Sequence, residues 1–114
     1  MYGGTGTDSA DYYDHTVGVV ADLDGAIGDD GAPGEGDTIA SDVEGINGGW
    51  GDDTLTGNGN ANVLDGRWGN DTLIGLAGND TLIGRSEADT FDGGLNTDSC
   101  DYVAGVDVSE TGCE

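Results

Sequence analysis

An acidic residue or its amide recurs at every ninth position in the second half of this chain. Residues 48–101 divide into six consecutive nonapeptides, each of which begins with glycine. The sixth positions hold Asp53, Asn62, Asp71, Asp80, Asp89 and Asp98. If the folded chain stacks them, two bare carboxylates about 5 Å apart repel by roughly 3 kcal/mol at an effective dielectric constant of about 20. A row of bound cations would remove this repulsion, so the spacing predicts a row of metal sites.

Glycine at the first, second and fourth positions of the units completes this chemistry. Because glycine adopts φ > 0 without penalty, the chain can turn tightly and leave carbonyl oxygens pointing into the turn. Flexible ligation by carboxylates and carbonyls favours Ca²⁺ over Zn²⁺ or copper, and over Mg²⁺, which needs a stricter octahedron. The predicted metal ligands in the six units are Gly49, Gly51, Asp53, Asn62, Gly69, Asp71, Gly78, Asp80, Asp89, Gly94 and Asp98.

Short strands must position these turns. The eighth positions are apolar and hold Leu55, Leu64, Leu73, Leu82, Phe91 and Cys100. Each turn leads into a three-residue strand whose middle side chain alone points inward, because side chains alternate along a strand. If two nonapeptides make one coil, residues eighteen apart stack at about 4.8 Å. The sixth positions then form two ladders, namely Asp53, Asp71, Asp89 and Asp107 on one side and Glu44, Asn62, Asp80 and Asp98 on the other.

The six units read GGWGDDTLT, GNGNANVLD, GRWGNDTLI, GLAGNDTLI, GRSEADTFD and GGLNTDSCD. This series resembles the calcium-binding nonapeptide repeats of the repeats-in-toxin (RTX) β-roll family, whose motif is G-G-x-G-x-D-x-U-x with an apolar residue at U. The resemblance implies an all-β fold, a right-handed parallel β-roll (β-helix solenoid) with two nonapeptides per coil and Ca²⁺ ions between turns. It also implies a structural module, exported by a bacterium, that folds outside the cell where calcium is abundant.

The register extends beyond the six units. Residues 3–11 form an N-terminal repeat with Asp8 at position six, and Glu44 and Asp107 hold the same position on either side of the array. We add these three residues to the predicted calcium ligands. The whole chain, residues 1–114, is therefore expected to form one β-roll domain with about four to six Ca²⁺ ions.

Residues 12–47 have the length of four nonapeptides, which predicts two further turns of the coil with a degraded sequence. Val17, Val19, Ala21 and Leu23 alternate as a strand longer than those of the repeats. The acidic stretch 24–37 (DGAIGDDGAPGEGD) lacks the helices and ligand spacing of an EF-hand. It is a candidate site for an extra ion through Asp29, Asp30, Glu35 or Asp37. A solvated loop without an ion explains its composition equally well.

The charge of the chain restricts its partners. Asp and Glu number 24 against 2 Lys and Arg, which gives a formal net charge of −22 at pH 7. Such acidity argues against nucleic acid and anionic membrane surfaces as partners. No apolar run approaches the roughly 20 residues of a membrane helix. The alternative to a calcium-folded domain is an intrinsically disordered acidic segment, and we expect that state when calcium is absent.

Two tryptophans and the two arginines share one spacing. Trp50 and Trp68 both stand at position three, eighteen residues apart, while Arg67 and Arg85 stand at position two with the same separation. We expect the indoles to stack on one edge of the roll. The edge is a candidate binding patch for a carbohydrate or another surface ligand, and a structural cover that screens carboxylates is the alternative.

The end of a solenoid needs a cap, and the last fourteen residues are expected to supply it. Gly105 and Asp107 keep the register as a weak seventh unit within 102–114. Cys100 and Cys113 are the two cysteines. We expect a disulfide that ties the tail over the open end, with two free buried thiols as the alternative. A disulfide would favour an extracellular location.

Catalysis is not expected. His15 has no second histidine or cysteine near it in the sequence, and the carboxylates recur at every rung rather than in one active site. The predicted function is thus a calcium-binding structural module of a secreted or cell-surface bacterial protein, either a monomer or part of a longer chain. The alternatives are an adhesin module that binds a surface or carbohydrate, and the C-terminal tail of a secreted enzyme or toxin. An ice-binding roll is disfavoured because the fifth positions are irregular.

Overall fold

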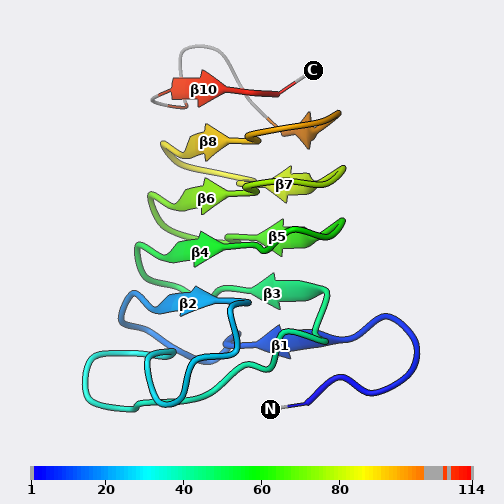
Figure 1. Cartoon of the computed structure of the whole chain (residues 1–114). Coiled ribbons are helices and arrows are strands. Elements are labelled where there is room, and N and C mark those ends of the chain that lie inside the picture. The colour runs from blue at the N-terminus through cyan, green and yellow to red at the C-terminus, as the bar shows by residue number, and fades with distance from the viewer. Residues whose placement is uncertain (1, 102–106, 108, 114) are drawn as a thin grey trace.

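The computed structural model describes residues 2–101, 107 and 109–113, and these form a two-sided stack of parallel strands (Figure 1). One sheet contains β1 (Ser9–Asp11), β3 (Gly45–Asn47), β5 (Val63–Asp65), β7 (Thr81–Ile83) and β9 (Ser99–Cys100). The other contains β2 (Val20–Asp22), β4 (Thr54–Thr56), β6 (Thr72–Ile74), β8 (Thr90–Asp92) and β10 (Ser109–Thr111). The chain crosses from one sheet to the other at each turn. The predicted all-β parallel β-roll is confirmed.

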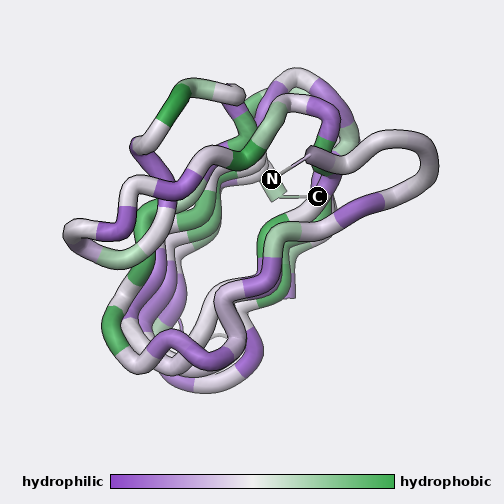
Figure 2. Tube along the Cα trace, turned by 90° about the horizontal axis from the view of Figure 1, so that it is seen from below, coloured by the Kyte–Doolittle hydropathy of each residue, from purple (hydrophilic) through white to green (hydrophobic). Residues whose placement is uncertain are grey.

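The strand register follows the nonapeptide period. Leu55 of β4 lies opposite Leu73 of β6, and Leu73 lies opposite Phe91 of β8. Ile46, Leu64 and Leu82 match one another in the same way across the other sheet. Eighteen residues therefore make one coil, so two nonapeptides per coil is correct. Viewed along the stack, successive coils superpose, with hydrophobic segments on both long sides (Figure 2).

The eighth positions form the core. Leu55, Leu64, Leu73, Leu82 and Phe91 are completely buried. In the repeats each three-residue strand contributes one such side chain, while its two neighbours in the strand are mostly half-buried or exposed. The three residues of β10 are all exposed. Removing a buried leucine side chain typically costs about 2–5 kcal/mol. A core only one side chain wide in each sheet leaves much of the stability of the domain to interactions in the turns.

The prediction of two further turns within residues 12–47 is wrong. Ser9 of β1 pairs directly with Gly45 of β3, so the intervening segment supplies a single coil and a single strand, β2. That strand has three residues, the same length as those in the repeats. Val17 is 59% exposed, and only the apolar residues that follow it enter the core, namely Val19, Ala21 and Leu23. The extra residues leave the coil after β2.

These extra residues cover the N-terminal end of the stack. Asp30 and Asp37 pair in antiparallel fashion. The amide of Val20 donates to the carbonyl of Gly31 at 3.1 Å, and the amide of Gly31 donates back at 2.9 Å. The loop, cyan in Figure 1, thus occupies the outer edge of β2, and Ile39 adds a buried side chain. An edge strand that would otherwise offer unpaired backbone groups is blocked in this way.

The C-terminal end is closed by the predicted disulfide. Cys100 of β9 is bonded to Cys113 with a Cα–Cα distance of 5.6 Å, and both cysteines pack against the core. The bond joins the last strand of one sheet to the segment after β10 in the other. Gly105 of the predicted cap lies outside the described residues. No helix in the described part of the chain is long and apolar enough to cross a membrane.

Candidate metal centre

The sixth-position side chains link successive coils through the backbone. The amide of Asp53 donates to Oδ1 of Asp71 at 2.8 Å, and the amide of Asp71 donates to Oδ1 of Asp89 at 2.9 Å. The amide of Asp89 donates to Oδ1 of Asp107 at 3.2 Å. Each partner lies eighteen residues away, so the structure brings together the first predicted ladder.

The second ladder has the same construction. The amides of Asn62 and Asp80 donate to Oδ1 of Asp80 and Asp98, both at 2.8 Å. Glu44 joins this ladder because its backbone carbonyl accepts from the side-chain amide of Asn62 at 3.3 Å. Its carboxylate accepts from the amide of Asp8 at 2.8 Å, which places the N-terminal repeat below it. Asp8, Glu44, Asn62, Asp80 and Asp98 thus form one continuous series.

Burial makes these carboxylates costly to ionise. Asp71, Asp80 and Asp89 are each no more than 2% exposed. Burial, and then the repulsion by Asp53 and Asp89, raises the pKa of Asp71 to about 7, although the backbone hydrogen bond opposes the shift. Burial, and then neighbouring acids, raises the pKa values of Asp80 and Asp89 to about 6. Among the described residues, no basic side chain contributes to the pKa values of Asp71, Asp80 and Asp89, so their negative charge is uncompensated.

The second carboxylate oxygen divides the turns into two classes. In the first class, which we call open turns, this oxygen is buried and has no hydrogen-bond partner among the described residues. The open turns end at Asp8, Asp71, Asp80, Asp89 and Asp98. In the second class, which we call closed turns, the equivalent oxygen accepts a hydrogen bond from a backbone amide. Gly49 donates to Oδ2 of Asp53, and Asn58 donates to Oδ1 of Asn62, both at 2.7 Å.

Backbone conformation separates the two classes. Positions two and four of every open turn have positive φ. The second positions, with φ between 75° and 93°, are Gly4, Arg67, Leu76, Arg85 and Gly94. The fourth positions, with φ between 82° and 114°, are Gly6, Gly69, Gly78, Glu87 and Asn96. The closed turns, 48–53 and 57–62, contain no residue with positive φ. A partnerless oxygen thus accompanies the left-handed conformation at position two in the described turns.

The closed turns are those that stack against the irregular N-terminal segment. The amide of Trp50 donates to the carbonyl of His15 at 2.8 Å, and the amide of Val19 donates to Oδ1 of Asp53 at 2.8 Å. The side chain of Asn58 reaches the carbonyls of Leu23 and Ser41. Neither turn therefore has a regular repeat beneath it. The predicted ligands Gly49, Gly51, Asp53 and Asn62 all belong to these two turns.

The first glycine of each turn, open or closed, lies directly against the sixth-position side chain, as Gly48 does against Asp53. A Cβ atom added at Gly66 would collide with Oδ2 of Asp71, and one added at Gly84 would collide with Oδ2 of Asp89. Buried, unpartnered carboxylate oxygens next to a space that a methyl group would fill are the surroundings that a hard cation with oxygen ligands requires. The residues of the open turns therefore fit Ca²⁺.

Side chains at position five also link successive coils, which was not predicted from the sequence. The amide of Asn70 donates to Oδ1 of Asp52 at 2.9 Å, and the amide of Ala88 donates to Oδ1 of Asn70 at 3.0 Å. On the other side, Thr97 donates to Oδ1 of Asn79 at 3.1 Å. Asp or Asn at position five with an eighteen-residue spacing was the available signal. These exposed links hold adjacent turns together beside the metal ladders.

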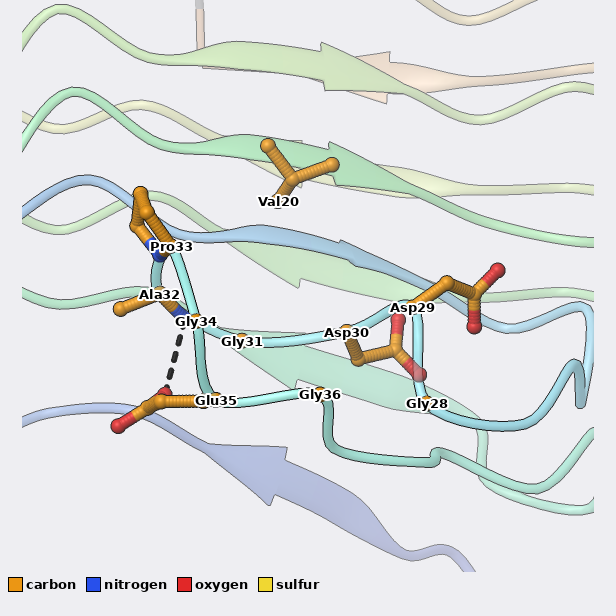
Figure 3. A pocket seen from close by; sticks show the side chains of 10 residues that line it. All are labelled: Val20, Gly28, Asp29, Asp30, Gly31, Ala32, Pro33, Gly34, Glu35 and Gly36. Atoms are coloured by element: carbon orange, nitrogen blue, oxygen red, sulfur yellow. Dashed lines mark hydrogen bonds between the residues drawn. The ribbon is translucent and has the colours of Figure 1, made fainter.

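The acidic loop does not gather its four predicted ligands at one point. Asp30 accepts from the amides of Asp22 and Ile39 at 2.7 and 2.8 Å, so its carboxylate braces the loop. The acidic loop lines a pocket in which Glu35 lies at the opposite end from Asp29 and Asp30 (Figure 3). Glu35 accepts from the amide of Ala32 at 2.9 Å. Asp37 hydrogen-bonds Tyr12, whose pKa is raised by burial first and by nearby acids, among them Asp37.

Asp29 instead lies near Asp22 and Asp24. Ligand atoms of these three residues lie within 4.8 Å of one another, and this is the one such acidic group of three in the described part of the chain. Two of the three are exposed, and Asp22 already accepts from the amide of Asp24 at 3.0 Å. The group lacks the buried, unpartnered oxygens that mark the open turns.

Comparison with known families agrees with the geometry. The model of the RTX calcium-binding nonapeptide repeat (4 copies) matches residues 47–82, 65–100 and 74–108. These matches cover both ladders from Asp53 onward. Among curated proteins, none matches the chain significantly.

Proposed function

The chain belongs to the family of RTX calcium-binding nonapeptide repeats, and we propose that it is a structural module that binds calcium through its open turns and folds as it does so. The observation that carries the proposal is the set of buried, unpartnered oxygens of Asp8, Asp71, Asp80, Asp89 and Asp98. Bound calcium supplies positive charge and a coordination shell for these oxygens. Glycines 69, 78 and 94 shape the same turns through their positive φ.

The closed turns have a different role in this proposal. Both carboxylate oxygens of Asp53 accept backbone amides, from Val19 and Gly49. Asn62 carries no charge, and its Oδ1 accepts from Asn58. We assign Asp53 and Asn62 to the joint between the N-terminal cap and the calcium-binding coils. The open turns alone set an expected stoichiometry of about four or five ions, near the lower end of the number expected from the repeats.

Calcium dependence of folding follows from the balance of forces. The core is one residue wide, and the ladders hold carboxylates whose ionised forms burial disfavours. A ligand that binds only the folded chain adds about 2.7 kcal/mol per site at a free concentration about 100 times its dissociation constant. Such a chain would stay unfolded at low cytosolic calcium and fold after export. We therefore place its site of action outside the cell, where the disulfide also persists.

Calorimetric titration tests the calcium assignment. Adding Ca²⁺ to chelator-treated protein is expected to give about four or five bound ions, whereas Mg²⁺ at the same concentration should displace few of them because it demands a stricter octahedron. The protein should carry the intact disulfide in both titrations. Binding of no more than one Ca²⁺, or equal binding of both metals, would contradict the proposal.

A further inference from the structure

The predicted stacking of the two tryptophans is present on the surface of the roll. The rings of Trp50 and Trp68 are nearly parallel, with centroids 4.3 Å apart and an interplanar angle of 9°. Trp50 is 56% exposed and Trp68 is 43% exposed. Aromatic rings of this size usually bury their surface, and exposed ones concentrate where a protein binds a partner.

The stack stops one coil short of the end of the array. Position three of the next coil holds Ser86, which is too small to continue it. A pocket of about 250 Å³ lies beside Trp68 and is lined by Arg67, Trp68 and Arg85. Trp50 does not line it, so a ligand in this pocket would contact Trp68 and the two arginines. Drug-sized ligands occupy sites of roughly 300–1,000 Å³, so this smaller volume suits one ring-sized group.

Each arginine that lines the pocket is paired with a carboxylate. Arg85 donates from Nε to Oδ1 of Asp65 at 2.7 Å, and Nη2 of Arg85 contacts the other oxygen of this buried carboxylate. Nη2 of Arg67 lies 3.5 Å from a carboxylate oxygen of Asp11. The two arginines of the chain thus meet at this pocket, and each is already paired with a carboxylate.

The backbone holds both arginines here at a cost. Arg67 and Arg85 have φ of 75° and 78°, a conformation that non-glycine residues rarely adopt. Glycine occupies the same position in the open turns at Gly4 and Gly94, so the calcium turn itself does not require arginine. Leu76 holds the same position with φ of 76°, so the charge of the two arginines is particular to this edge.

We infer that the exposed face of Trp68 binds a neutral sugar ring of a polysaccharide. The C–H face of the sugar would stack on the indole, and its hydroxyl oxygens would accept from the guanidinium groups of Arg67 and Arg85, which line the pocket. A neutral ligand is favoured over an acidic one because both guanidinium groups are already paired and the chain carries a net charge of −22. An anionic sugar would have to displace a carboxylate and approach an acidic surface.

The test is a titration of calcium-loaded protein with neutral hexasaccharides of glucose, mannose and N-acetylglucosamine, and with a hexasaccharide of galacturonic acid, each up to about 10 mM. At least one neutral hexasaccharide is expected to change the tryptophan fluorescence and to bind measurably by calorimetry. Trp68→Ala is expected to weaken that binding by about tenfold or more, and Trp68→Tyr, which keeps an aromatic face, to restore most of it.

The matched control is Leu95→Ala. Leu95 is an exposed apolar residue that also stands at position three, on the opposite edge of the roll, and its removal should leave sugar binding unchanged. Unchanged calcium stoichiometry in each variant shows that the roll is intact, so a loss of sugar binding can be separated from a loss of calcium binding. The inference would be overturned if only the galacturonate oligomer bound, or if none of the four oligomers bound. It would also be overturned if Trp68→Ala bound the sugar as well as the original protein does.

Discussion

The oxygen left without a partner in each open turn is the smallest feature on which the function depends. Asp71 and Asp53 occupy the same ladder, are equally buried, and each binds an amide of a neighbouring coil through Oδ1. They differ in Oδ2, which is free in Asp71 and accepts from Gly49 in Asp53. Two chemically identical residues at repeat-equivalent positions are therefore expected to behave differently toward calcium.

We predict that Asp71→Asn removes at least one bound calcium ion or weakens its binding by about tenfold or more, whereas Asp53→Asn leaves the stoichiometry unchanged. Asparagine has one acceptor oxygen, so Asp71→Asn keeps its Oδ1 hydrogen bond, whereas Asp53→Asn loses one of its two amide hydrogen bonds. Calcium calorimetry on the two variants provides the measurement. Equal losses in both variants would mean that the acidity acts as diffuse charge and that the open and closed classes have no functional meaning.

Because the pKa values of Asp71, Asp80 and Asp89 are raised, the calcium-free protein is predicted to become less ordered as the pH rises. An unfolded aspartate has a pKa of about 3.9, whereas the pKa in the fold is about 7 for Asp71 and about 6 for the other two. The fold therefore holds more protons than the unfolded chain between these values, and its stability falls as pH rises from about 4 to 7.

After calcium is removed on a chelating resin, circular dichroism should thus show more β-structure at about pH 4.5 than at pH 8. With calcium present the trend reverses, because protons compete for the same carboxylates and apparent calcium affinity should fall below about pH 7. A calcium-free chain that gains order as the pH increases would contradict the assignment of these three side chains to the buried ladders.

The turn is the element that carries the site, and its first glycine can be tested separately from the acid. Gly66→Ala would place a Cβ against Oδ2 of Asp71, and overpacking of this kind typically costs about 1–3 kcal/mol. The variant should lose calcium affinity and melt at a lower temperature in calcium. Gly59→Ala is the matched control, because a Cβ there meets nothing within 4 Å. Thermal melts that do not distinguish the two variants would refute the packing argument.

The nonapeptide period was enough to predict the strands and the ladders but not the state of each turn. Position eight must be buried, and position six must bind the next coil. Both requirements are met only in the eighteen-residue register, so the sequence pattern specifies that register. By contrast, GGWGDD has glycine at all three repeat positions and still forms a closed turn. What lies beneath it is the carbonyl of His15 rather than a repeat, and only the folded N-terminal segment reveals this.

The terminal caps depart from the period for a related reason. The sequence of residues 12–47 has the length of two coils, yet residues beyond β2 leave the stack to block its edge. Length alone could not distinguish continued coils from a covering loop. At the other end, Glu110 of β10 lies opposite Phe91, a separation of nineteen rather than eighteen residues. The cysteines at positions 100 and 113 gave a better signal there than the repeat pattern did.

The disulfide is predicted to stabilise the C-terminal element. Closing a loop of this size contributes roughly 3 kcal/mol in the chain-entropy model. Replacing both cysteines, as Cys100→Ser with Cys113→Ser, should lower the melting temperature of the calcium-loaded protein while leaving the sites in the middle of the array able to bind. Differential scanning calorimetry measures the change. An unchanged melting temperature would show that the tail does not act as a clamp.

For the molecule as a whole, bound calcium is expected to be part of the fold. The described chain is compact, with a Cα radius of gyration of 12.8 Å. It carries a formal charge of −22 and buries a thin core, so the uncompensated ladders should be enough to keep it unfolded at neutral pH. The structural change on calcium binding should then involve the entire roll rather than a loop.

Small-angle X-ray scattering with and without calcium at neutral pH measures whether the whole chain unfolds when calcium is removed. In excess chelator the account predicts an expanded chain with a radius of gyration of about 30 Å or more, as expected for an unfolded chain of this length. In millimolar calcium it predicts contraction to a compact particle consistent with the 12.8 Å of the folded backbone. A chain that is already compact in chelator, with the same scattering curve after calcium is added, would contradict the account.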